Sequence, residues 1–197
     1  PGQEHKATIK SESHAAISSG ITSICCPPDT QPVVDTAAVA ELIQQRAESV
    51  GLLRLLPLGA LTHGLKGEHL AELLALKRAG CVGVSNAYAD ITNTDVLRHA
   101  LEYAYSCNMT VFIQAEDHYL KGDGIAHEGA ISTRLGLSPI PETAETVALS
   151  QALLLIEQIG GRAHFGRLSC ARSIALIKEA KKAGLPVSAD VGICHLH

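Results

Sequence analysis

The stretch ARSIALIKEAKKAGLPVSADV, residues 171–191, contains the structural unit from which the chain is built. Its first part spaces apolar residues three and four positions apart, which predicts an amphipathic helix over Ala171–Ala183. Gly184 follows as a residue that ends helices, and the apolar run Pro186–Val191 predicts a buried strand. Helix, glycine and strand therefore form one unit.

The same alternation fills the rest of the chain. Apolar runs predict strands over Ile21–Cys26, Leu52–Leu58, Cys81–Ser85, Met109–Gln114 and Arg162–Leu168. Helical periodicity predicts helices over Lys6–Ser19, Thr36–Ser49, Lys66–Ala79, Asn93–Cys107 and Pro141–Ile159. Glycines between a helical pattern and a strand stand at positions 20, 51, 80, 160 and 184. The chain therefore consists of consecutive strand and helix units.

Repeated βα units form either an open, doubly wound sheet or a closed eight-stranded barrel. No Gly-rich G-x-G-x-x-G and no P-loop follows a predicted strand, so the nucleotide-binding open sheet has no direct support. We therefore predict an α/β fold, a (β/α)8 TIM barrel of which residues 1–197 supply about six βα units as one domain. In either architecture, functional residues follow the carboxyl ends of the strands.

Composition excludes several classes of function. The net charge of −4 and the pI near 6.2 give no basic surface for nucleic acid or anionic lipid. No apolar stretch approaches the roughly 20 residues of a membrane helix, and the N-terminus does not resemble a signal peptide. The six cysteines form no C-x-x-C pair, so we expect reduced, mostly buried thiols in a cytoplasmic protein.

Polar residues gather after the predicted strands, where chemistry is expected. These segments are Pro27–Pro32, Ser85–Tyr88, Gln114–His118, Arg167–Ser169 and Asp190–His197. The third opens a long predicted loop, Ala115–Ile140. A loop of this length inside a compact domain is usually functional, although a plain surface excursion is the alternative.

Several motifs occur in a fixed order along the chain. They are Gly2-Gln3-Glu4-His5-Lys6, Pro28-x-Thr30-x-Pro32, Gly59-Ala60-Leu61-Thr62-x-Gly64, Ala115-Glu116-Asp117-x-x-Leu120, Glu128-Gly129, Leu135-Gly136-Leu137-x-x-Ile140-Pro141 and His195-Leu196. With these motifs the whole chain resembles the dihydroorotases of the amidohydrolase superfamily. The resemblance implies a zinc-containing (β/α)8 barrel that reversibly cyclises carbamoyl aspartate to dihydroorotate in pyrimidine synthesis.

The resemblance also implies which positions hold the metal. The family's H-x-H pair ends a strand directly before a Pro-Gly like Pro1-Gly2, so we expect that strand and the last two to lie outside these residues. Within the chain, the family's Ser-Asp-Asp-Gly turn reads Ser85-Asn86-Ala87-Tyr88. Gln114 and Arg167 replace the two histidines of the family's His-Ala-Glu-Asp and His-Val-Ser motifs. Asn86, Gln114 and Arg167 are therefore degenerate metal-ligand positions.

These replacements are unfavourable for a metal. Zinc takes thiolate, imidazole or carboxylate, and the amides of Asn86 and Gln114 are poor neutral substitutes. A guanidinium is permanently charged and has no lone pair to donate. At about 4 Å from a dication and an effective dielectric near 20, the guanidinium of Arg167 would be repelled by roughly 8 kcal/mol. We therefore predict no metal.

The substrate pocket implied by the resemblance is degenerate as well. Asp29 stands where active relatives have an asparagine, and it would set a negative charge against a dicarboxylate-like ligand. His195 matches a family pocket position. Our hypothesis is that Arg167 replaces the missing metal charge and pairs with Glu116, Asp190 or Asp29; a solvated Arg167 is the alternative.

Two further clusters allow a functional and a plain interpretation. Cys194, His195 and His197 could bind a metal by themselves, but we favour an ordinary loop end. Ser169 and Cys170 near His164 could form a nucleophile and a base. Ser169 precedes a predicted helix, so we favour an N-cap.

The leading hypothesis is a dihydroorotase-like pseudoenzyme without a cofactor. Because some inactive dihydroorotase homologues hold aspartate transcarbamoylase catalytic subunits in a complex, the resemblance implies that subunit as partner and an oligomeric state. One alternative is an active zinc dihydroorotase or related cyclic amidohydrolase with ligands outside this chain. A second is a protein that binds another small molecule near Asn86 and Arg167.

Overall fold

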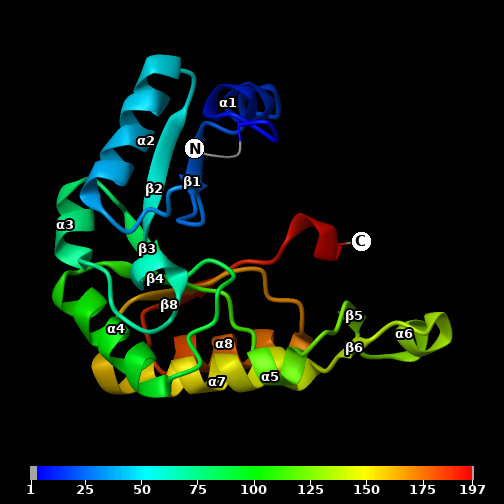
Figure 1. Cartoon of the computed structure of the whole chain (residues 1–197). Coiled ribbons are helices and arrows are strands. Elements are labelled where there is room, and N and C mark those ends of the chain that lie inside the picture. Colours follow the sequence, from blue (N-terminus) through cyan, green and yellow to red (C-terminus); the bar gives the residue numbers. More distant parts are fainter. Residues whose placement is uncertain (1–3, 197) are drawn as a thin grey trace. The chain divides into compact units, whose positions relative to one another are not determined.

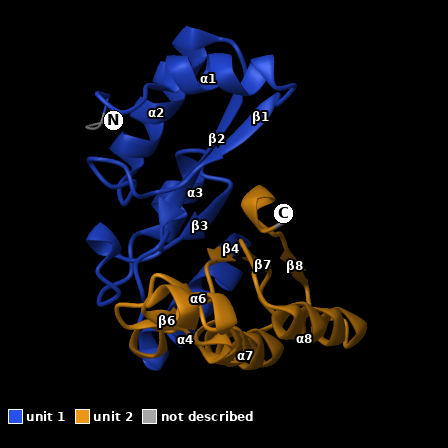
Figure 2. Ribbon diagram, turned by 90° about the vertical axis from the view of Figure 1, so that its right-hand side faces the viewer, with its two compact units in different colours: residues 1–111 blue, residues 112–197 orange. Residues whose placement is uncertain are grey.

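The predicted alternation of strands and helices is present in the computed structural model, which describes residues 4–196 (Figure 1). The chain divides into two compact units, residues 1–111 and 112–197, coloured separately in Figure 2. The first unit contains α1 (Ile9–Ser18), β1 (Ser23–Cys26), α2 (Ala37–Val50), β2 (Arg54–Ala60), the 3-10 turn η1 (His63–Leu65), α3 (Leu73–Arg78), β3 (Gly83–Ser85) and α4 (Thr94–Ser106). Strand β4 (Thr110–Ile113) includes the boundary.

The second unit contains α5 (His118–Lys121), β5 (Ala126–His127), α6 (Ala130–Leu135), β6 (Pro139–Ile140), α7 (Glu142–Ile159), β7 (Ala163–Phe165), α8 (Ala171–Lys182), β8 (Val187–Ala189) and η2 (Ile193–Leu196). All six predicted strands and all six predicted helices exist, with shifted ends. The five glycines predicted to end helices have φ between 63° and 90°, a region that residues with a Cβ rarely adopt.

Parallel strands form the centre of each unit. In the first unit, β1 pairs with β2 from Ser23↔Arg54 onward, and β2 pairs with β3 from Leu58↔Gly83 onward. In the second unit, β7 pairs with β8 in the same direction. Helices α2 and α3 pack on β2, and α8 packs on β8. Buried aliphatic residues of these helices, such as Ile43, Leu76 and Ile177, supply the core between helix and sheet.

The third helix is shorter than predicted. The sequence predicts Lys66–Ala79, but α3 covers only Leu73–Arg78. The main-chain N–H of Gly67 donates to the Thr62 hydroxyl at 3.0 Å, and Thr62 and Leu70 form an antiparallel bridge. Gly67 also has a φ of 71°, which is not helical. These bonds hold residues 66–72 in a loop in spite of the helical spacing.

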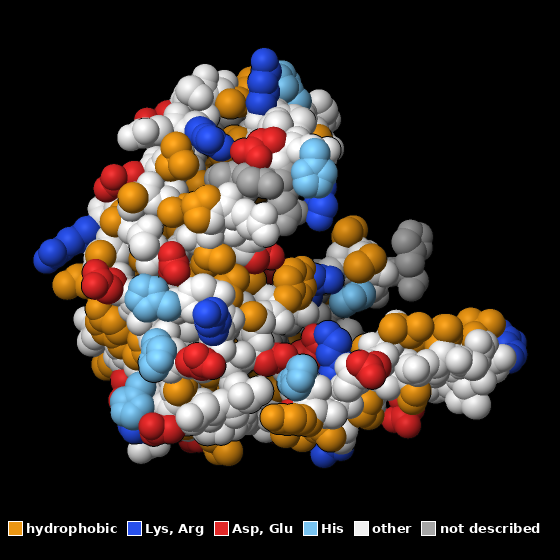
Figure 3. All heavy atoms as spheres, in the orientation of Figure 1, with side chains coloured by type: hydrophobic (Ala, Val, Ile, Leu, Met, Phe, Trp, Pro, Cys, Tyr) orange, Lys and Arg blue, Asp and Glu red, His pale blue; other side chains and the backbone are white. Residues whose placement is uncertain are grey.

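The predicted loop Ala115–Ile140 contains regular structure. It carries two short helices, α5 and α6, and the two parallel strands β5 and β6. Its glycines had indicated turns, but a Cβ on Gly124 would lie only 2.5 Å from the side chain of Ile140. Helix α6 exposes the apolar side chains of Ile131 and Leu135, and apolar side chains cover one side of this segment in Figure 3.

The thiols are less buried than expected. All six cysteines are free, as predicted, but only Cys81, Cys107 and Cys170 are buried. Burial raises the pKa of the Cys81 thiol to about 11. Cys25 is exposed and Cys26 half-buried, because neighbouring residues of strand β1 point to opposite sides.

Among the described residues, no helix has the length and apolarity that a membrane span requires.

A close contact between β2 and α3 gives a testable prediction. A Cβ on Gly59 would lie 2.8 Å from Cδ1 of the fully buried Leu76, so Gly59→Ala should lower the free energy of unfolding by about 1–3 kcal/mol through overpacking. Urea unfolding of the full-length protein measures this loss. Gly166→Ala, where a Cβ would meet no atom within 4 Å, is the control.

A double substitution tests the cause of the expected loss. Because alanine at position 76 removes Cδ1 and Cγ and leaves only Cβ at 3.2 Å, Gly59→Ala should cost less in a Leu76→Ala background than in the wild type. Equal losses in the two backgrounds would contradict the proposed clash.

Candidate functional site

Asn86 lies directly after β3 and is only 8% exposed. Its Oδ1 accepts a hydrogen bond from the Thr62 hydroxyl at 2.7 Å. Its Nδ2 donates to the carbonyl oxygens of Ala89 at 2.9 Å and Leu65 at 3.4 Å. Asn86 thus links the loops that follow β2 and β3, both of which belong to the first unit.

These hydrogen bonds determine whether Asn86 could bind a metal ion. Both amide donors are directed at carbonyl oxygens, and the amide oxygen already accepts from Thr62. A metal ion would need a negative or strongly donating ligand here, whereas the surroundings fit a neutral amide that both donates and accepts. Asn86 therefore acts as a structural crosslink in this loop pair, and it is a poor metal ligand.

Asp29 occupies an exposed turn after β1. The turn is organised by its neighbours: the Thr30 hydroxyl donates to the carbonyl of Pro32 at 2.7 Å, and the N–H of Val34 donates to the carbonyl of Pro28 at 3.0 Å. Val34 is fully buried and accepts from the main chain of Ala60. The fold thus holds Asp29 at the surface beside the carboxyl end of β1.

Asp35 was not singled out from the sequence, yet it also connects loops in the first unit. Its Oδ2 accepts from the main-chain N–H of Gly64 at 3.0 Å and lies 3.5 Å from Nδ1 of His63. Gly64 ends the motif Gly59-Ala60-Leu61-Thr62-x-Gly64, and Thr62 in that motif is the partner of Asn86. The motif therefore positions the loop after β2 against both neighbouring loops.

In the second unit, β4 and β7 place Gln114 and Arg167 at comparable positions. The N–H of Gly166 donates to the carbonyl of Ile113 at 3.0 Å. Gln114 directly follows Ile113, and Arg167 directly follows Gly166. Gln114 is half-buried, whereas Arg167 is exposed. Arg167 adopts a φ of 60°, a left-handed conformation that is strained for a residue with a Cβ.

Asp190 holds this strained main chain. Its Oδ1 accepts from the N–H of Arg167 at 2.7 Å, and its Oδ2 lies 2.9 Å from Nε2 of His164. Burial by itself would raise the pKa of Asp190, but these hydrogen bonds and the positive charges of His164 and Arg167 outweigh it and lower that pKa. A carboxylate is therefore favoured beside Arg167.

Of the three carboxylates considered as partners of Arg167, Asp190 contacts it through the main chain. The positive charge of Arg167 favours the ionised form of Asp190. Glu116 forms an ion pair with Lys121 at 3.0 Å. An ion pair between the guanidinium of Arg167 and a carboxylate stays a prediction.

His164 has a different role from the one considered for it. It lies opposite Ser188 in the β7–β8 register, and its Nδ1 is 2.8 Å from the Ser188 hydroxyl. Its Nε2 faces Asp190, and its ring centroid is 5.2 Å from that of Phe112. The pairing across β7 and β8, which periodicity along one strand does not reveal, directs His164 toward these groups instead of Ser169 or Cys170.

The N-cap prediction for Ser169 is wrong. Helix α8 begins after Cys170, and Glu145 of α7 occupies its N-terminus. The Glu145 carboxylate accepts from the Ser169 N–H at 2.9 Å, the Ser169 hydroxyl at 2.6 Å and the Cys170 N–H at 3.2 Å. Burial would raise the pKa of Glu145, but these bonds prevail and lower it. Sequence reasoning missed this cap because the carboxylate comes from another helix.

The pKa of the Cys170 thiol is raised, whereas that of Glu145 is lowered. It lies 3.5 Å from Nε2 of His127, which is a geometry compatible with a thiol and base pair. Burial and the nearby Glu145 carboxylate nevertheless raise the pKa of Cys170. The thiol form is therefore favoured, which makes Cys170 a poor nucleophile.

The chain's last histidines do not form a described metal cluster. Nδ1 of His195 lies 3.3 Å from the carbonyl of Leu168, whereas Cys194 is exposed. His197, the third member of the cluster considered, lies outside the described residues, as do Pro1, Gly2 and Gln3. Within residues 4–196, no three His, Cys, Asp or Glu side chains gather in a way that could hold a metal ion. Of the described residues, the two amides Asn86 and Gln114 and the guanidinium of Arg167 are poor ligands for zinc.

Comparisons with known proteins agree on one family. A family model described as "Dihydro-orotase-like" matches residues 1–173. The "Dihydroorotase-like protein" of Pseudomonas putida is 51% identical over 100% of this chain and 46% of that protein. A "Dihydroorotase" of Anaeromyxobacter sp. (strain K) is 43% identical over 100% of this chain and 45% of that protein. The chain thus spans less than half the length of these relatives.

Solved structures show the same fold at low sequence identity. The L-hydantoinase (dihydropyrimidinase) from Arthrobacter aurescens is 20% identical with a TM-score of 0.75, over 94% of this chain and 42% of that one. The dihydroorotase in complex with 5-fluoroorotic acid from Saccharomyces cerevisiae is 15% identical with a TM-score of 0.72, over 95% and 52%. These likenesses confirm the predicted fold class, an amidohydrolase-type (β/α) barrel of which this chain supplies about six units.

Proposed function

Because the chain belongs to the dihydroorotase-like family, we propose that its protein is a catalytically inactive member with a structural role in pyrimidine biosynthesis. In this proposal the barrel is retained for assembly and the metal site is lost. The partner is the catalytic subunit of aspartate transcarbamoylase, the protein is oligomeric, and the location is the cytoplasm. The partner and the oligomeric state rest on resemblance to the family.

The observation that carries this proposal is Arg167 at a position where the family resemblance implies a histidine ligand. The guanidinium is permanently protonated, and the ionised Asp190 beside it accepts the main-chain N–H of the same residue. Asn86, bound to Thr62, Ala89 and Leu65, supports the same conclusion at a second ligand position. Gln114 adds a neutral amide at a third.

A working zinc enzyme is the second candidate. It is favoured by the 43% identity to relatives that are called dihydroorotases and by the large part of those relatives that this chain does not cover. Its metal ligands would have to come from the uncovered part and tolerate the positive charge of Arg167. The substrate would then be a cyclic amide whose C–N bond is hydrolysed.

Metal analysis and an activity assay on the full-length protein distinguish the two candidates. We expect less than stoichiometric zinc after purification in zinc-containing buffer and no hydrolysis of dihydroorotate above background. The Anaeromyxobacter dihydroorotase, prepared in parallel, is the control for both measurements. Stoichiometric zinc together with turnover would refute the inactive protein and support the enzyme.

The structural role needs a separate measurement. We expect the full-length protein to elute from a sizing column together with the aspartate transcarbamoylase catalytic subunit of the same organism, at a mass above that of either component. A protein that elutes strictly as a monomer in the presence of that subunit would contradict the structural role, whatever the metal analysis gives.

A further inference from the structure

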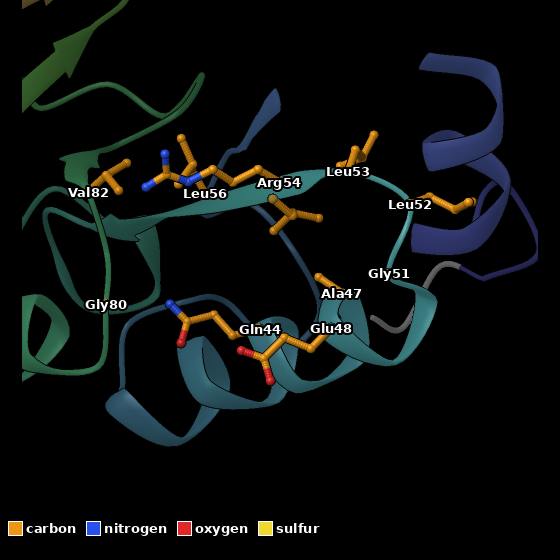
Figure 4. Close-up of a pocket in the computed structure, with 11 residues that line it drawn as sticks. Gln44, Ala47, Glu48, Gly51, Leu52, Leu53, Arg54, Leu56, Gly80 and Val82 are labelled. Atoms are coloured by element: carbon orange, nitrogen blue, oxygen red, sulfur yellow. The ribbon is translucent and has the colours of Figure 1, made fainter. Parts of the chain in front are cut away.

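A pocket of about 610 Å³ lies between α2 and β2, within the first unit (Figure 4). Its volume falls in the range of pockets that hold small molecules, roughly 300–1,000 Å³. The residues that precede β2 and β3 contribute to its wall, among them Gly51, Leu52 and Gly80. The pocket is therefore at the amino ends of these strands, whereas Asn86 and Asp29 follow carboxyl ends.

Both apolar and polar surface line the pocket. Leu52, Leu53, Leu55 and Leu56 line it from β2 and the segment before it, and Ala47 and Val82 complete the apolar lining. The four leucines are only half-buried, although leucines between a helix and a sheet are usually enclosed. An apolar body placed here would remove their remaining surface from water.

Three polar side chains face the same space. Gln44 and Glu48 line it from α2, with the Gln44 amide directed toward Gly80, and Arg54 extends along β2 (Figure 4). Within residues 4–196, the side chains of these three residues form no hydrogen bond or ion pair with other protein groups. The pocket thus offers a positive group and a negative group on opposite walls, with a neutral amide between apolar surfaces.

Gly80 leaves room for the amide of Gln44. A Cβ at position 80 would lie 2.3 Å from Nε2 of Gln44, so the side chain rests directly over the glycine. Gly80 also has a φ of 90°, which disfavours any other residue. The half-buried Gln44 therefore lies against the turn between α3 and β3.

We propose that this pocket binds a small zwitterion with an apolar body, of the class of the free apolar amino acids. The carboxylate pairs with the guanidinium of Arg54, whose planar fork suits a carboxylate. The ammonium group pairs with Glu48, and the aliphatic side chain lies against the leucines. A purely apolar ligand would leave both charges unused, and a simple anion would face Glu48 without a positive group.

Calorimetric titration of the full-length protein with three probes tests this assignment. L-leucine carries both charges, 4-methylpentanoate lacks the ammonium group, and 3-methylbutylamine lacks the carboxylate. We expect L-leucine to bind and each of the other two to bind about tenfold more weakly, which corresponds to one lost charge-assisted interaction. Absence of L-leucine binding at millimolar concentration would overturn the proposal.

Matched variants assign the charges. Arg54→Gln should weaken the binding of L-leucine and of 4-methylpentanoate about tenfold and leave the binding of 3-methylbutylamine unchanged. Glu48→Gln should weaken the binding of 3-methylbutylamine about tenfold and leave the binding of 4-methylpentanoate unchanged. Val82→Phe, which fills the pocket from an exposed position, should abolish binding of all three. Glu41→Gln, on the same helix but outside the pocket lining, is the control. Equal effects of Arg54→Gln and Glu41→Gln would also refute the proposal.

Discussion

Replacement of Glu145 by alanine is expected to lower the free energy of unfolding by about 3 kcal/mol. The Glu145 carboxylate accepts three hydrogen bonds, two of them from the main-chain N–H groups of Ser169 and Cys170 at the start of α8. Each bond to a charged acceptor contributes about 1.5–3 kcal/mol, and the three are not additive. The loss leaves two donors of the helix N-terminus unsatisfied. Urea unfolding of the full-length protein at neutral pH measures it.

The charge of Glu145 should also make the free energy of unfolding depend on pH. Because the folded pKa lies below the unfolded one, the stabilisation is fully present above the unfolded pKa and is lost as the pH falls through the folded pKa. The difference in unfolding free energy between the wild type and Glu145→Gln should therefore shrink as the solution is acidified below about pH 4. A difference that does not change with pH would contradict a charge contribution.

A matched variant separates this cap from general helix effects. Glu157→Ala lies on the same helix, is exposed, and should change the unfolding free energy by less than about 0.5 kcal/mol. If Glu157→Ala and Glu145→Ala were equally destabilising, the loss would come from helix α7 itself and not from the cap of α8.

Replacement of Asn86 by aspartate is expected to destabilise the protein by about 2–4 kcal/mol, even though it restores the residue type that the family resemblance implies for active relatives. A carboxylate in this site would face the carbonyl oxygens of Ala89 and Leu65, to which the amide now donates. Only the Thr62 hydroxyl would remain as a donor. A buried charge with a single hydrogen-bond donor carries this cost.

Two measurements check the prediction for Asn86. In urea unfolding of the full-length protein, the loss caused by Asn86→Asp should decrease as the pH falls, because a protonated carboxyl can donate one hydrogen bond to the Ala89 carbonyl. Asn93→Asp is the control, since Asn93 is an exposed N-cap that aspartate serves equally well. An Asn86→Asp protein as stable as the wild type, with stoichiometric zinc, would instead support a site ready for metal.

Local sequence patterns were sufficient for the repeating unit. Apolar runs and helical spacing located every main strand and helix, since both depend on short-range periodicity against a common core. Their ends were less certain. The bonds between Thr62, Gly67 and Leu70 shorten α3, and these contacts were not visible in the helical spacing of residues 66–79.

The partners of the site residues required the fold. That Asn86, Gln114 and Arg167 replace metal ligands stays a prediction from the family resemblance, whereas the chemistry of each side chain is a property of the residue alone. The connection of Asn86 to Thr62 spans 24 residues, and that of Ser169 to Glu145 spans a similar distance. Such pairs form only when the strands and helices between them are in place.

The amino-acid sequence by itself determined the βα units and the side-chain chemistry available at Asn86, Gln114 and Arg167, since periodicity, helix-ending glycines and a permanently charged guanidinium are local properties. The tertiary structure decided that Asn86 is a crosslink, that Glu145 caps α8, that Asp190 holds the main chain of Arg167, and that Arg54 and Glu48 face one pocket. Hydrogen bonds and pockets depend on distances between atoms that are remote in sequence, and those distances are fixed only when the strands pair and the helices pack.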